Sequence, residues 1–145
     1  FRAVLDRYIS RFAAKHEAQL FCEEKSVEQA LRDYFTAVAT CFTSKDTPAG
    51  CFMINTSATL AASSKEIANT VKSRHAMQEE TLSAFLAQRQ QRGEIPAQCN
   101  PQLLAQYLSC ILQGMSISAR EGATLEKLQN ISDTTLRLWP ELLKI

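Results

Sequence analysis

Few residues of this chain could do chemistry, and their spacing forms no known catalytic or metal-binding motif. Helical proteins can hold two metal ions through ExxH pairs, but Ala13 and Lys72 stand three positions before His16 and His75. The GxSxG motif of serine hydrolases and the phosphate loops GxGxxG and GxxxxGKS/T do not occur in the sequence. We therefore expect no catalytic residue, no metal site, no cofactor and no enzyme activity.

The sulfur chemistry is open to two interpretations. The chain has an odd number of cysteines, mostly within apolar helical pattern: Cys22, Cys41, Cys51, Cys99 and Cys110. This usage is typical of reduced thiols in the cytoplasm, where a free cysteine is usually a small buried hydrophobe. However, Cys22 lies in a polar segment and Cys41 and Cys51 flank one turn, so a thiol-based redox or electrophile sensor is an alternative.

Two polar residues interrupt the inner face of a long expected helix. His75 and Gln78 share this face with apolar residues, namely Ile67, Val71, Leu82, Phe85 and Leu86. A buried polar side chain needs a hydrogen-bond partner, which either the core or a bound ligand can supply. The sequence leaves both possibilities open.

Length and charge limit the functional classes. The 145 residues carry a formal net charge of +1, with 21% charged residues, and suit one domain over 1–145. A nearly neutral chain has no broad attraction for nucleic acid or an anionic membrane. No apolar run reaches the roughly 18 residues of a membrane span. Because the chain starts at Phe1 in a helical pattern, we expect that a segment precedes it in the parent protein.

Hydrophobic periodicity and capping residues predict an all-α protein with about six helices and no strand. Ser26, Ser63, Asn100 and Thr124 are suitable N-caps, and Gly93 is a suitable helix stop. The expected helices cover residues 1–20, 27–43, 51–62, 63–92, 102–120 and 125–139.

The helix over residues 102–120 is the most apolar of these and has a single strongly ionic side chain, Arg120. It requires cover on more than one side, from the other helices and from a second subunit. Gly114 within it costs about 1 kcal/mol relative to alanine, a cost that close approach of another backbone would offset.

Three segments in this order resemble the C-terminal ligand-binding and dimerisation domain of TetR/AcrR-type bacterial transcriptional regulators. They are PAGCFMINTSATLAA from Pro48, RGEI at the end of the long helix, and LQGMSISAREGATLEKLQNI from Leu112. The resemblance implies a repressor that releases operator DNA when a small apolar or amphipathic ligand binds. It also implies that an N-terminal helix-turn-helix domain of the parent protein, absent from this sequence, makes all contact with DNA.

The resemblance further implies a ligand pocket among the helices and a homodimer formed through the last two helices. With inward-facing positions taken as the guide, the candidate ligand-binding residues are Phe12, Phe35, Val38, Ile54, His75, Gln78, Leu82, Phe85, Tyr107 and Ile111. The candidate dimer-interface residues are Leu112, Gly114, Met115, Ser116, Ala119, Leu128, Ile131, Thr135, Leu138 and Trp139. Within the apolar helix, Leu104, Tyr107 and Ile111 are expected to face the core and pocket. A helical interaction module unrelated to transcription is a further alternative.

Overall fold

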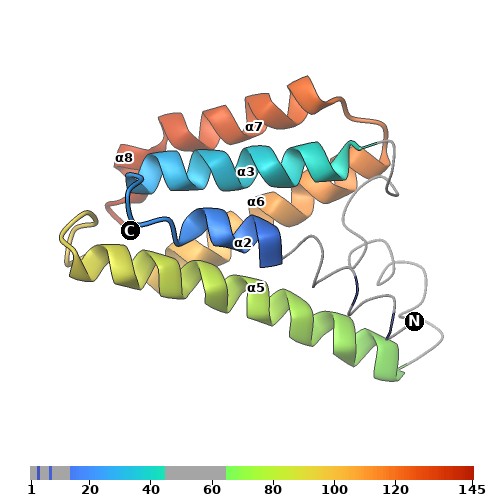
Figure 1. Ribbon diagram of the computed structural model, residues 1–145, viewed down its shortest axis with the longest axis horizontal. Helices are drawn as coiled ribbons and strands as arrows, with labels where there is room; N and C mark the ends of the chain where they lie inside the picture. Colours follow the sequence, from blue (N-terminus) through green and yellow to red (C-terminus); the bar gives the residue numbers. More distant parts are fainter. Residues whose placement is uncertain (1–2, 4–6, 8–13, 45–64) are drawn as a thin grey trace.

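The computed structural model describes residues 3, 7, 14–44 and 65–145, and this part of the chain is all-α (Figure 1). Its helices are α2 (Ala14–Leu20), α3 (Val27–Phe42), α5 (Lys65–Gln91), α6 (Pro101–Arg120), α7 (Leu125–Arg137) and α8 (Trp139–Leu142). The predicted fold class is confirmed. Most of the expected first helix, the segment 51–62 and the start of the long helix at Ser63 lie outside the described residues.

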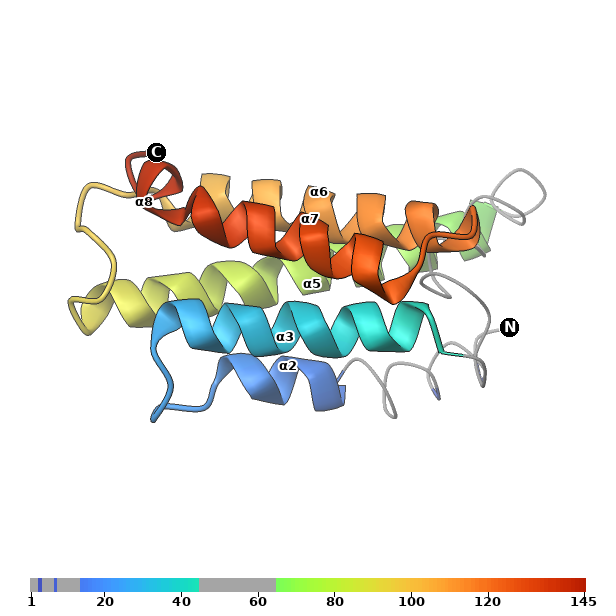
Figure 2. The same ribbon diagram turned by 90° about the horizontal axis from the view of Figure 1, so that it is seen from above.

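The helices form a bundle in which α3 lies between α2 and α7, as both views show (Figures 1 and 2). The long helix α5 packs along α6, and α6 also contacts α3 and α7. Apolar side chains of α3, α5 and α6 meet in one core, including Leu31, Phe35, Leu82, Phe85 and Leu108, each at most 1% exposed. Of the helices in the described ranges, none is both long enough and apolar enough to span a bilayer.

Polar caps fix where three helices begin, as the sequence predicts. Ser26 Oγ accepts from the Gln29 amide at 3.2 Å, and Thr124 Oγ1 accepts from the Lys127 amide at 3.1 Å. At the start of α6, Asn100 Oδ1 accepts from the amides of residues 102 and 103 at 3.0 and 3.2 Å. Gly93, with φ of 82°, follows α5 in the left-handed conformation that stops a helix.

The end of the chain differs from the expectation that one helix runs to residue 139 and closes at Pro140. Instead, α7 ends at Arg137, and Pro140 lies in the first turn of the short helix α8. Proline is tolerated there because the first helical amides have no intrahelical acceptor. The last residue is tied back to the bundle, since the Asn100 amide donates to the Ile145 carbonyl at 2.9 Å.

Candidate functional site

The best candidate for a ligand site is the inner face of α5 where it meets α3. Of the predicted pocket residues, four lie in the core between these helices: Phe35, Val38, Leu82 and Phe85, all at most 4% exposed. Phe12 and Ile54 lie outside the described residues. The described part of the site is therefore strongly apolar, with His75 and Gln78 on α5 as its polar members.

His75 has a ring nitrogen that is buried in the bundle. The residue is half-buried, and its Nε2 atom has no hydrogen-bond partner among the described residues. Burial lowers the pKa of His75 from its ordinary value of 6.5, so the imidazole is neutral at pH 7. A neutral imidazole nitrogen can donate or accept one hydrogen bond, depending on its tautomer.

Gln78, one turn further along α5, is paired within the protein. Its Nε2 donates to the hydroxyl of Tyr34 on α3 at 3.3 Å, and Tyr34 is 2% exposed. Of the two possibilities that the sequence left open, the core hydrogen bond thus applies to Gln78. His75 is different. Ser109 Oγ on α6 is also buried and unpaired among the described residues, but a serine hydroxyl can rotate toward the carbonyl one turn earlier, which an imidazole cannot do.

Tyr107 and Ile111 do not join this site. Tyr107 is 38% exposed, and both residues line a groove of about 310 Å³ between α6 and α7. The other residues of the groove are Lys127, Asn130, Ile131, Thr134, Thr135 and Leu138. The expectation that Tyr107 faces the core is wrong, because the inward face of α6 carries Leu104, Leu108 and Leu112. Ile111 is half-buried and packs against the core, and a role of either residue in ligand binding stays a prediction.

The predicted interface residues also divide differently from the expectation. Most of their side chains are buried in the core of the chain itself: Leu112, Met115, Ser116, Ala119, Leu128, Thr135 and Trp139. Gly114 and Leu138 are exposed, and Ile131 is half-buried. The assignment of Leu112, Met115, Ser116 and Ala119 to the partner side of α6 is therefore corrected, since side chains at most 4% exposed cannot line a free surface.

Exposed apolar residues lie on the opposite side of α6 and at the end of α7, and we call this set the outer face. It comprises Leu103, Tyr107, Gly114 and Ile117 of α6 with Leu138 of α7; Leu103, Ile117 and Leu138 are each at least 45% exposed. A Cβ atom added to Gly114 would meet nothing within 4 Å, so nothing in the described chain requires glycine there. Sequence reasoning missed Leu103 and Ile117, although both lie in the same apolar pattern.

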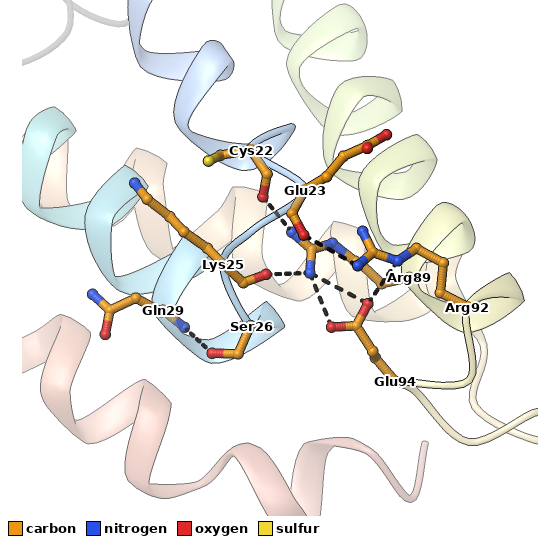
Figure 3. A network of polar contacts seen from close by, with 8 residues as sticks. All are labelled: Cys22, Glu23, Lys25, Ser26, Gln29, Arg89, Arg92 and Glu94. Atoms are coloured by element: carbon orange, nitrogen blue, oxygen red, sulfur yellow. Dashed lines mark hydrogen bonds and ion pairs between the residues drawn. The ribbon is translucent and has the colours of Figure 1, made fainter.

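A second feature that sequence reasoning missed is a buried arginine at the end of α5. Arg89 is 1% exposed, and its guanidinium donates to the carbonyls of Cys22 and Lys25 in the turn between α2 and α3 (Figure 3). Its Nη1 also lies 3.0 Å from the Glu94 carboxylate. The neighbouring Arg92 donates to the Glu23 carbonyl at 3.1 Å. We call Arg89 and Arg92, with the three carbonyls that they hold, the arginine clamp.

The thiols and acidic groups form no evident reactive centre in the part of the chain that the structure describes. Cys22 and Cys41 are half-buried, Cys110 is exposed, and Cys51 lies outside the described residues. Burial raises the pKa of the Cys99 thiol, which disfavours its reactive thiolate form. Within the same ranges, no cluster of three or more His, Cys, Asp or Glu residues is placed to hold a metal ion.

Comparison with known proteins identifies this architecture. A family model described as "Tetracyclin repressor-like, C-terminal domain" matches residues 27–133. The chain belongs to the TetR family. It is a C-terminal domain of a TetR-type transcriptional repressor and not an enzyme. The resemblance drawn from the three sequence segments is confirmed.

Individual members of the TetR family agree with this identification. The chain is 75% identical over 144 residues to the HTH-type transcriptional repressor ComR of Escherichia coli (strain K12), covering 99% of the chain and 69% of ComR. In fold, it is similar to CifR, a TetR family regulator solved as a cysteine mutant with double-stranded operator DNA. The TM-score is 0.86 at 20% identity, over 97% of this chain and 73% of CifR. A second CifR structure gives 0.84 at 18% identity, over 94% and 71%.

The state of His75 predicts how stability depends on pH. Because burial places its folded pKa below the unfolded value, protons bind preferentially to the unfolded chain as the pH falls below 6.5. Urea unfolding should therefore show a loss of stability between about pH 7.5 and about pH 5.5, and His75→Gln should reduce that loss. His16→Gln is the matched variant and should also reduce the loss, since burial and the neighbouring Lys15 lower the pKa of His16 as well. A pH dependence unchanged by His75→Gln would contradict the buried, neutral state of this ring.

Proposed function

We propose that the chain is the effector-binding and dimerisation domain of its repressor, and that a small apolar or amphipathic ligand bound between α3 and α5 causes release of DNA. The observation that carries the proposal is the buried His75 Nε2 beside an apolar face, an atom to which no group in the described part of the chain is hydrogen-bonded. A ligand with mostly apolar surface and one hydrogen-bonding group would satisfy both features. The Gln78–Tyr34 pair is the neighbouring polar group that such a ligand would meet.

Release of DNA requires that the ligand binds two conformations unequally, since a ligand with equal affinity for both shifts neither population. We propose that α2 carries the change toward the DNA-binding part of the parent protein. In this proposal operator DNA is bound by a separate N-terminal helix-turn-helix domain that precedes residue 1, and this chain makes no contact with DNA. The formal net charge of +1 supports this division.

We propose a homodimer that is formed through the outer face. Several large apolar side chains exposed on α6 and α7 are the kind of surface that a partner covers. Gly114 lies among them without any contact that requires it, so a helix of a second copy can approach the α6 backbone there. The groove of about 310 Å³ beside Tyr107 offers that copy a recess for side chains.

The ligand site is tested by thermal melting in the presence of small amphipathic compounds. A compound at 100 times its dissociation constant should stabilise the domain by about 2.7 kcal/mol if it binds only the folded state. His75→Leu should weaken binding of a compound with one polar group by about 1–3 kcal/mol, roughly 5- to 150-fold. Gln88→Ala is the control, because Gln88 is exposed on the same helix. Compounds that stabilise wild type and His75→Leu equally would disprove this site.

The dimer is tested by sedimentation velocity at micromolar concentration. The unmodified chain should sediment at twice its mass of 16.2 kDa, and Ile117→Glu should shift it to a monomer because a charge would be buried against an apolar partner. Met77→Glu is a matched control, because Met77 is 51% exposed but lies on α5, away from the outer face. A monomeric wild type, or equal behaviour of the two variants, would rule out this interface.

A further inference from the structure

The turn between α2 and α3 is held at three main-chain carbonyls by the arginine clamp. Arg89 Nη2 donates to Cys22 O at 2.9 Å, Arg89 Nη1 donates to Lys25 O, and Arg92 Nη2 donates to Glu23 O at 3.1 Å (Figure 3). These bonds join positions more than 60 residues apart in the sequence. The turn is thus fixed to the last turn of α5 through its backbone, whatever side chains it carries.

The charge of Arg89 makes this attachment difficult to release. Arg89 is 1% exposed, and its guanidinium pairs with the Glu94 carboxylate. Arg92 contacts the same carboxylate, with 3.2 Å between Arg92 Nε and Glu94 Oε2. A buried charge that loses its partners is strongly unfavourable. If the turn moved away, the Arg89 donors that now bond Cys22 and Lys25 would be left without acceptors. The C-terminal end of α2 therefore stays where Arg89 is.

Side chains also hold the C-terminal end of α2. Leu20, its last residue, is fully buried, and the Lys25 side chain just beyond it bonds Gln19 Oε1 at 3.0 Å and Asp33 Oδ2 at 2.6 Å. Earlier in α2, Lys15 and Ala18 are exposed. The body of the helix packs along α3 (Figure 2).

Phe85 connects the clamp to the ligand site. Its ring lies under the guanidinium, 5.4 Å from Arg89 Cζ to the ring centroid, and meets the edge of Phe21 at 6.2 Å between centroids. Phe21 is the first residue after α2. On the other side, Phe85 continues the face of α5 that carries Gln78 and Leu82. A ligand that displaces the fully buried Phe85 ring would have to displace Arg89 or Phe21 with it.

We propose that Arg89 is the positioning residue that fixes the C-terminal end of α2 to α5, and that Phe85 transmits occupancy of the ligand site to this attachment. The role of Phe85 rests on the proposed function, because the signal that it transmits is the binding of the proposed ligand. The clamp itself does not depend on a ligand, and it can be tested without one.

Hydrogen exchange of the folded chain, followed by mass spectrometry, tests the clamp. Arg89→Lys keeps the charge but cannot reach two carbonyls with one ammonium group. Amides in residues 18–26 should exchange about tenfold faster or more, while residues 101–137 keep their wild-type rates. If Arg89→Lys does not fold, Arg92→Ala removes the third carbonyl bond of the clamp and should speed exchange in the same residues, because Arg92 is 40% exposed and bonds Glu23 O. Unchanged exchange in residues 18–26, or an equal increase throughout the chain, would overturn the proposal.

The link through Phe85 has a matched control. Phe85→Leu removes the ring beneath Arg89 and should also speed exchange in residues 18–26. Phe35→Leu removes a ring that is about equally buried but lies in α3, in a T-shaped contact with Tyr34, so any increase should not be confined to the turn. Identical patterns for the two variants would refute the link. A chain that shows the local effect but binds no compound would disprove the effector function and leave the clamp intact.

Discussion

The burial of one positive charge constrains much of this structure. The Arg89 guanidinium is almost fully removed from water, and it is satisfied only when the α2–α3 turn, the Glu94 carboxylate and the Phe85 ring are all in place. These groups come from distant parts of the sequence. Their convergence fixes the α2–α3 turn to the end of α5, next to the face of α5 at which we propose that a ligand binds.

The apolar helix α6 serves two surfaces at once. Leu104, Leu108 and Leu112 fill the core, while Leu103, Tyr107 and Ile117 remain on the outer face. In a regulator that acts as a dimer, such a helix connects the interior of one subunit with the position of the other. The proposed ligand site and the proposed dimer interface thus lie on opposite sides of α6, so a shift of α6 at one of them would also move residues of the other.

Local chemistry was readable from the sequence, but the orientation of buried faces was not. Ser26, Asn100, Thr124 and Gly93 act on their own neighbours, so their capping and stopping roles were predicted correctly. Around α6, apolar residues cover most of the circumference. Periodicity therefore could not decide which stripe faces inward, and residues such as Leu112 were placed on the wrong side. Arg89 was missed because its partners are carbonyl oxygens, which every residue carries.

The measurement that tests the account most directly is a double-mutant cycle on the free energy of unfolding with Arg89→Lys and Phe85→Leu. If the guanidinium, the ring and the clamped turn act as one unit, the loss of unfolding free energy in the double variant should differ from the sum of the two single losses by about 0.5–3 kcal/mol. Losses that add to within about 0.3–0.5 kcal/mol would show that the two residues act independently, and would contradict the central role given to the buried arginine.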